Sequence, residues 1–229
     1  MPAIGLFTIC VKLCYFLIND AWMYAALRRY LQSKIDIPEE ILKELEPLCI
    51  DDHASKGDII LKVDEVCKYN FFVAGGCLRS YVFDKKGREH ILQFAPDEWW
   101  ISERISLLSG DPATFFIDAI EDTSYVRVPE EFLTQLGLRV PAAKALLERL
   151  RLNNFRSIRK RLISLLSDTG EDRYLSFVNT YPALALRLPQ KMIASYLGIT
   201  PESLSRIRKT LSKSQTQLKG RDIVSPFDY

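Results

Sequence analysis

The chain has 229 residues, of which 48% are hydrophobic and 26% charged, and its formal net charge is +2. This composition excludes a disordered chain, and the length accommodates two domains with separate cores. The net charge does not by itself indicate a nucleic-acid partner. Five cysteines, an odd number, favour reduced thiols in a cytoplasm over a disulfide framework. No second close pair follows Cys10 and Cys14, so we expect no metal or iron–sulfur site.

The first 22 residues differ from the rest of the chain. Residues 4–18 are strongly apolar but are interrupted by Lys12, and they are short for a spanning helix. They also lack the basic start and the cleavage site of a signal peptide. An ordinary amphipathic helix begins at Met23. We therefore interpret residues 1–22 as an extension that need not be native, and we expect no membrane partner.

Residues 23–137 predict a domain built around antiparallel strands. A helix begins at Pro38, and from Ala54 to Pro129 short apolar strands alternate with glycine-containing turns at regular intervals. This pattern indicates a compact antiparallel barrel or jelly roll. The expected strands cover Asp58–Leu61, Tyr69–Ala74, Leu78–Phe83, Glu89–Phe94, Thr114–Ile120 and Ser124–Val128.

A short helix over Glu130–Leu136 precedes a long helix over about residues 142–166. The apolar positions of the long helix are mostly three and four apart, and a helix of this length has surface left after packing on its own barrel. We therefore predict residues 138–166 as a dimerisation helix. Its apolar positions include Leu146, Leu147, Leu150, Phe155, Ile158, Leu162 and Leu165.

Residues 190–209 form two short amphipathic segments that meet at Gly198. Gly198 permits the positive φ of a tight turn, Thr200 caps the second segment, and Pro201 takes its first helical position. The pattern predicts a helix-turn-helix within a DNA-binding domain over residues 167–229. The alternative is an ordinary helical hairpin with a solvated charged face. The buried stripe of the second helix is Leu204, Ile207 and Leu211.

Basic residues concentrate in the same region. Between Leu186 and Arg221 the chain has eight Lys or Arg and a single acid, Glu202, which leaves the remainder net acidic. A basic C-terminal part on an acidic body is typical of a sensor joined to a DNA-binding module.

The order of elements (helix, jelly-roll barrel, long helix, helix-turn-helix) resembles the Crp/Fnr family of bacterial transcription regulators from about Met23 to the end. The resemblance implies an α+β fold with an N-terminal β-roll sensor barrel, a long dimerisation helix and a C-terminal winged helix-turn-helix domain. Since only eighteen residues follow Leu211, we expect the wing to be small or absent.

The segment Glu202-Ser-Leu-Ser-Arg206 resembles the E-x-x-S-R pattern of the Fnr-type branch, whose members read TTGA-like half-sites. The resemblance implies that Glu202 accepts a hydrogen bond from a cytosine amine, Arg206 donates to guanine, and Ser205 contacts a neighbouring base. The alternative for Glu202 is that it only stabilises a helix N-terminus. Contacts with phosphates and the register of binding are expected from Gln190, Lys191, Thr200, Ser203 and Lys209.

The expected barrel departs from the cyclic-nucleotide-binding members of the family. Those members carry a G-E-L segment and an R-S-A segment, and the arginine of the latter pairs with the cyclic phosphate. Here Ser102-Glu103-Arg104 and Ala113-Thr114-Phe115 take these positions, so Glu103 is retained but the phosphate arginine is missing. A buried phosphate without its cation is costly, which argues against cyclic AMP, with Arg104 as an alternative cation. The Fnr-type iron–sulfur cysteines are not matched, and no cofactor is evident. The candidate pocket for an unknown effector is Glu103, Arg104 and Thr114.

We therefore predict a cytoplasmic, homodimeric, sequence-specific transcription regulator that binds double-stranded DNA at a near-palindromic site, with RNA polymerase as a further partner. Its barrel responds to an unknown small-molecule effector or to none. An enzyme is not expected, because His53 and His90 lack any catalytic or metal-binding pattern. The remaining alternative is a ligand-sensing or membrane-tethered interaction protein whose DNA-binding module is vestigial.

Overall fold

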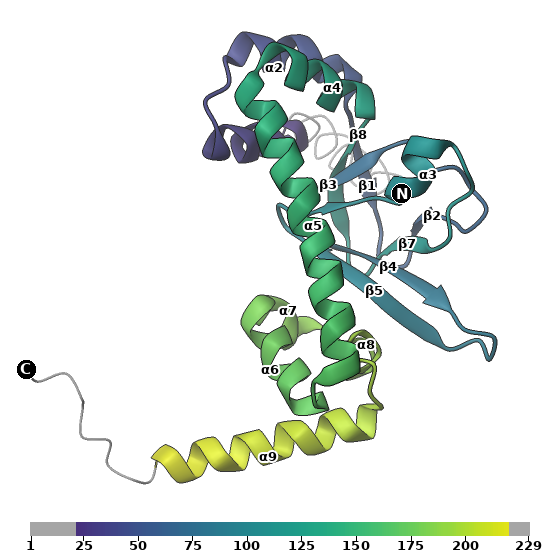
Figure 1. Ribbon diagram of the computed structural model, residues 1–229, viewed down its shortest axis with the longest axis vertical. Helices are drawn as coiled ribbons and strands as arrows, with labels where there is room; N and C mark the ends of the chain where they lie inside the picture. Colours follow the sequence, from purple (N-terminus) through teal and green to yellow (C-terminus); the bar gives the residue numbers. More distant parts are fainter. Residues whose placement is uncertain (1–21, 220–229) are drawn as a thin grey trace, which may run out of the picture. The chain divides into compact units, whose positions relative to one another are not determined.

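The computed structural model describes residues 22–219, which fall into two compact units divided between Arg156 and Ser157. The division lies inside one continuous helix, α5 (Pro141–Ser167), which therefore contributes residues to both units (Figure 1). Of the expected extension, only Trp22 lies within the described residues, and Cys10 and Cys14 lie outside them. Within residues 22–219 no helix is both long and apolar enough to cross a membrane.

The first unit contains a barrel of two four-stranded antiparallel sheets (Figure 1). One sheet has the strand order β1-β8-β3-β6 and the other β2-β7-β4-β5. This arrangement confirms the predicted α+β class with an antiparallel barrel. The strands are β1 (Ile50–Ala54), β2 (Ile59–Leu61), β3 (Asn70–Gly75), β4 (Cys77–Phe83), β5 (Glu89–Pro96), β6 (Trp100–Ile101), β7 (Phe116–Ala119) and β8 (Thr123–Val128).

Apolar side chains from both sheets fill the barrel, because successive residues of a strand point to opposite faces. On β4, Leu78 belongs to this core, whereas the next residue, Arg79, bonds to Asp118 on β7. Leu78 and Arg79 thus point to opposite faces of the sheet. The core residues include Leu61, Phe71, Val73, Leu78, Ala95, Ile101, Ile117 and Tyr125.

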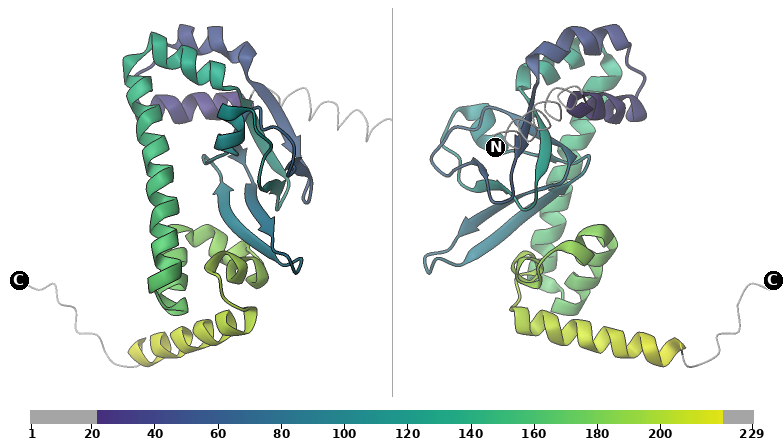
Figure 2. Two further views of the ribbon diagram at one scale, coloured as in Figure 1. Left: turned by 45° about the vertical axis from the view of Figure 1, so that its right-hand side comes forward. Right: turned by 180° about the vertical axis from the view of Figure 1, so that it is seen from behind.

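Helices cover the other face of β3 and β8. Phe72 and Val126 are fully buried beneath helical residues 22–34, α2 and α4. Each such side chain contributes about 1.5–3 kcal/mol when it is fully removed from water. The first turns of α5 join this core through Ala143, Leu146 and Leu147 (Figure 2). The covering helices are α2 (Glu39–Leu45), the 3-10 turn η1 (Glu46–Leu48) and α4 (Glu130–Arg139).

Three elements of the first unit do not follow from its sequence pattern. The edge strand β1 has the polar sequence IDDHA, and β6 has only two residues, too few to show an alternation. The third is the short helix α3 (Arg104–Ser109), which begins within the candidate effector segment. Its N-terminus is capped by the Glu103 carboxylate, which accepts a hydrogen bond from the Ser106 amide.

The second unit consists of helices in its described part: the end of α5, then α6 (Gly170–Thr180), α7 (Pro182–Arg187), α8 (Gln190–Leu197) and α9 (Pro201–Lys219). Thr169 and Asp172 form a capping box that starts α6. Arg173 donates to the Asp168 carbonyl at 2.7 Å and so satisfies a carbonyl group at the end of α5. Caps on both sides of the corner thus fix the path of the chain from α5 into α6.

Candidate nucleic-acid interface

The helix-turn-helix is formed by α8 and α9. Gly198 ends α8 with φ of +65°, in the left-handed region that glycine adopts without strain. The Ile199 amide then donates to the Ala194 carbonyl at 3.0 Å, which closes the turn. A Cβ atom on Gly198 would lie 3.0 Å from a methyl group of Leu165 on α5. Glycine is therefore needed both for the turn and for the close approach to α5.

Thr200 caps α9, as predicted. Its hydroxyl accepts a hydrogen bond from the Ser203 amide at 3.2 Å. Pro201 occupies the first helical position, where no N–H group is required. The Thr200 cap and Pro201 therefore start α9 three residues after Gly198, and this starting point determines which residues of α9 face outward.

The two faces of α9 are divided as the sequence predicts. Leu204 is fully buried, and Ile207 and Leu211 are half-buried. The side chains expected to read bases, together with Lys209, are exposed on the opposite face, because residues three and four apart share a helix face. The structure thus brings one acid, one hydroxyl and two cations to one exposed face: Glu202, Ser205, Arg206 and Lys209.

The expected phosphate contacts are in two different situations. Gln190 and Lys191 are exposed in the first turn of α8, where they are open to a ligand. Thr200 and Ser203 are already bonded to each other through their hydroxyl groups at 3.2 Å. The Ser203 hydroxyl also accepts from Arg206 Nη2 at 3.2 Å. In the free protein these two hydroxyls therefore orient Arg206, a role that sequence reasoning missed.

The Glu202 carboxyl is held in its ionised form. Its own backbone amide and the Thr200 hydroxyl donate to it, and Arg206 adds a favourable charge, so the pKa of Glu202 lies below its usual value. A carboxylate accepts hydrogen bonds only. In contact with a base edge, Glu202 can therefore accept from an amine but cannot donate to a carbonyl.

No wing strand follows the recognition helix within the described residues. Instead α9 continues for 19 residues to Lys219. The small or absent wing stays a prediction. The residues beyond 219 lie outside the described range.

The candidate effector residues do not all meet. Glu103 is buried, and the Thr114 hydroxyl donates to its second oxygen at 3.5 Å. Arg104 instead lies 3.5 Å from Glu130 on α4, at the start of that helix. The structure therefore places Glu103 and Thr114 together and directs Arg104 to a different partner.

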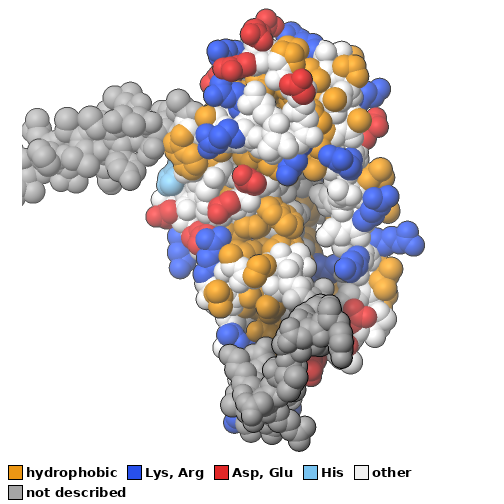
Figure 3. Space-filling model, turned by 90° about the vertical axis from the view of Figure 1, so that its left-hand side faces the viewer, with side chains coloured by type: hydrophobic (Ala, Val, Ile, Leu, Met, Phe, Trp, Pro, Cys, Tyr) orange, Lys and Arg blue, Asp and Glu red, His pale blue; other side chains and the backbone are white. Residues whose placement is uncertain are grey.

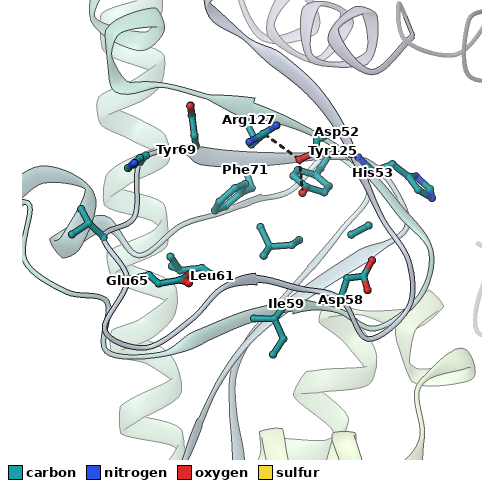
Figure 4. A pocket seen from close by; sticks show the side chains of 14 residues that line it. Asp52, His53, Asp58, Ile59, Leu61, Glu65, Tyr69, Phe71, Tyr125 and Arg127 are labelled. Atoms are coloured by element: carbon teal, nitrogen blue, oxygen red, sulfur yellow. Dashed lines mark hydrogen bonds and ion pairs between the residues drawn. The ribbon is translucent and has the colours of Figure 1, made fainter.

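A pocket of about 490 Å³ opens elsewhere on the barrel, between β1, β2 and β8 (Figure 4). Asp52 lies on its wall and accepts from the Tyr125 hydroxyl at 2.9 Å, while Arg127 Nε lies 3.1 Å from the same carboxylate (Figure 4). Burial, with the Asp52 carboxylate, raises the pKa of Tyr125 above its usual value, so the phenol remains a donor. These three polar groups are thus engaged with one another, and Glu103, Arg104 and Thr114 do not line the pocket.

The two histidines lie in unrelated surroundings. His53 is on β1 beside Ser124, and His90 is on β5 with its ring nitrogen 3.1 Å from Asp84. Both side chains are exposed. Among residues 22–219 no group of three or more His, Cys, Asp or Glu side chains is placed to hold a metal ion.

The long helix α5 has two distinct parts. Leu146 and Leu147 pack into the barrel unit, but every residue from 151 to 160 is exposed. Hydrophobic side chains lie at the surface among Lys and Arg, as one face of the molecule shows (Figure 3). Four exposed apolar residues of α5 follow a spacing of three, seven and four, which places them on one side of the helix. We refer to Leu152, Phe155, Leu162 and Leu166 as the α5 stripe.

Comparison with known proteins agrees with this architecture. Residues 52–139 match the family model described as a cyclic nucleotide-binding domain. The chain is 22% identical over 204 residues to the fumarate and nitrate reduction regulatory protein of Vibrio cholerae, an alignment that covers 84% of this chain and 78% of that protein. It is 25% identical over 186 residues to the transcriptional activator protein Anr of Pseudomonas aeruginosa, with 76% and 72% covered.

Solved structures show the same fold. FixK2 from Bradyrhizobium japonicum matches with a TM-score of 0.63 at 24% identity, covering 73% of this chain and 86% of that one. A CooA mutant from Carboxydothermus hydrogenoformans matches with a TM-score of 0.60 at 17% identity, covering 80% and 83%.

The barrel, the long helix and the helix-turn-helix, together with these relatives, define a DNA-binding transcription regulator rather than an enzyme. Residues 52–139 match the cyclic nucleotide-binding domain family, and the relatives and solved structures support a regulator of the Crp/Fnr type.

Proposed function

We propose that the protein is a homodimeric regulator that reads a near-palindromic DNA site with TTGA-like half-sites. The observation that carries this proposal is the exposed face of α9, where Glu202, Ser205 and Arg206 stand together opposite the buried Leu204. An arginine donates two parallel hydrogen bonds to guanine, and a carboxylate accepts from a cytosine amine. The face thus has the donors and acceptors that such a half-site requires.

The α5 stripe supports the homodimer. An exposed row of large apolar side chains on a helix is costly in water and is suited to packing against a second copy of the same helix. Two recognition helices would then enter successive major grooves about 34–36 Å apart. Such a regulator acts in the cytoplasm with RNA polymerase. Cyclic AMP is not the effector we expect, because Ala113 stands where the family has its phosphate arginine. Arg104 pairs with Glu130 instead of joining Glu103 and Thr114.

Replacing Arg206 with alanine should relax specificity at one base pair of each half-site. The expected cost on the cognate site is about 1–3 kcal/mol per half-site, with little change on a site mutated at that pair. Gel-shift titrations on the palindrome, on single-base variants and on random DNA measure this directly. Full discrimination by the Arg206→Ala variant would refute the base assignment. An absence of specificity over random DNA in the wild type, at every salt concentration, would favour an interaction protein with a vestigial DNA-binding module.

Replacing Lys209 with alanine should weaken DNA binding without changing base specificity, unlike the Arg206 substitution. Lys209 is exposed on the same face one turn further along α9, and as a phosphate contact it reads no sequence. We expect affinity to fall by a similar factor on all sequences, and the slope of log K against log salt to become shallower by about 1 for each subunit. Binding titrations between low and physiological salt give the slope. An unchanged slope, or a loss confined to one base pair, would contradict the assignment.

A further inference from the structure

Arg161 lies on the second half of α5 and contacts the first helix of the helix-turn-helix. Its Nη2 atom donates to the Tyr196 carbonyl at 2.8 Å, near the C-terminal end of α8. The carbonyls in the last turn of a helix lack partners within the helix and carry partial negative charge, so a cation is favourable there. The bond therefore joins α5 to the end of α8.

The same guanidinium also lies over the Tyr196 ring, with its central carbon 4.3 Å from the ring centroid. The ring in turn contacts Phe177 on α6 at a centroid distance of 5.5 Å and Tyr181, between α6 and α7, at 6.2 Å. Burial lowers the pKa of Arg161 from its usual value. A half-buried charge thus lies where the side chains of Arg161, Phe177, Tyr181 and Tyr196 meet.

Two close approaches accompany this contact. If Gly198 carried a Cβ atom, that atom would lie 3.0 Å from the side chain of Leu165, which follows Arg161 by four residues on α5. If Gly170, at the start of α6, carried a Cβ atom, that atom would lie 3.3 Å from side-chain atoms of both Ile199 and Ile207. Apolar packing thus sets how close the helix-turn-helix lies to α5 and α6, but packing alone is non-directional. The planar guanidinium, which stacks and donates at fixed angles, adds direction.

We propose that Arg161 is a positioning residue that holds the helix-turn-helix at a fixed orientation to the second half of α5, and that this orientation sets the spacing between half-sites that the dimer accepts. This inference rests on the proposed function. The second half of α5 also carries Leu162 and Leu166 of the α5 stripe, so part of the proposed dimer contact lies in the same compact unit as the helix-turn-helix. Arg161 itself points away from the stripe, because a helix turns by about 100° per residue and Arg161 is therefore about 100–180° around the helix from each of the four stripe residues.

The test compares binding to palindromes that differ only by one base pair added at the centre, which rotates one half-site by about a tenth of a turn. Two linked sites gain on the order of 10²–10⁴-fold in affinity only when both can be engaged. We expect the wild type to lose at least about 100-fold on the longer site. Arg161→Met, which retains the length of the side chain but not the charge, should lose less than about tenfold, because a loosened module adapts to both sites.

Three variants complete the comparison. Tyr196→Leu removes the ring beneath the guanidinium and should behave like Arg161→Met, whereas Tyr196→Phe retains the ring and should behave like the wild type. Both variants keep the backbone carbonyl that accepts from Arg161. Arg156→Met makes the same change at an exposed position of α5 and serves as the matched control. Sedimentation should show that all variants remain dimeric. Arg161→Met and Tyr196→Leu variants that discriminate between spacings as sharply as the wild type would overturn the proposal.

Hydrogen exchange of the intact, DNA-free protein gives a second readout that does not depend on DNA binding. Loss of the Arg161 contact should speed the exchange of α8 amides relative to those of the barrel. If the wild type showed no sequence-specific binding, the proposed function would fail, and the exchange data would still decide the role of Arg161. Unchanged α8 exchange in both Arg161→Met and Tyr196→Leu would then overturn it.

Discussion

Replacing Phe155 with aspartate is expected to convert the protein from a dimer to a monomer and to lower its affinity for a palindromic site by about 10²–10⁴-fold. Phe155 is 65% exposed in the single chain, so the substitution leaves the core of the subunit intact. In the dimer each ring would be buried, and a symmetric contact counts twice, so its loss removes about 3–6 kcal/mol. The two buried carboxylates add a further desolvation penalty.

Asn153→Asp is the matched control for this prediction. It places the same carboxylate on the same helix, two residues away and on the side opposite the α5 stripe, where the residue is exposed. Sedimentation equilibrium should give a dimer for the wild type and Asn153→Asp, and a monomer for Phe155→Asp. Binding to an isolated half-site should be equal for all three. A Phe155→Asp variant that remained a dimer would place the subunit contact elsewhere than on the stripe.

The helix-turn-helix could be predicted because its signals are local. Gly198, Thr200 and Leu204 lie within seven residues, and each acts through its own backbone conformation, its cap or its helix face. The exposed Glu202, Ser205 and Arg206 follow from the same helical periodicity. The barrel could be predicted as a class for a similar reason, since glycine-containing turns between short strands are also local.

The features that could not be predicted depend on partners distant in sequence. The polar edge strand β1 carries Asp52, whose side chain is matched by Tyr125 and Arg127 on β8. The contact between Arg161 and Tyr196 joins residues 35 positions apart. From the sequence, a single polar or charged residue is predicted to be solvent-exposed. Only the fold shows which distant group bonds to it and so offsets the cost of its burial.

Arg79 is the clearest example of such compensation. It is 7% exposed on β4, and it donates from Nε and Nη2 to the two oxygens of Asp118 on β7, at 2.7 and 3.0 Å. A third bond runs from Nη1 to Glu89 on β5 at 2.6 Å. Burial opposes the charge, but the bonds to Asp118 and Glu89 outweigh it, so the pKa of Arg79 lies above its usual value. One guanidinium therefore joins three neighbouring strands.

Replacing Arg79 with methionine should destabilise the barrel by about 3–5 kcal/mol, because it leaves the buried Asp118 carboxylate without its partner. The double variant Arg79→Met/Asp118→Leu should recover most of this loss, since an apolar pair of similar volume is often as stable as a buried ion pair.

Arg88→Met is the matched control. Arg88 pairs with Asp84 at 2.8 Å on the surface, so the loss of this pair should cost less than about 1 kcal/mol. All three tryptophans (Trp22, Trp99 and Trp100) lie in the first unit, so urea unfolding followed by their fluorescence reports on the barrel alone. If Arg79→Met unfolded at the same urea concentration as Arg88→Met, the three-strand ion network would contribute no more to stability than a surface pair.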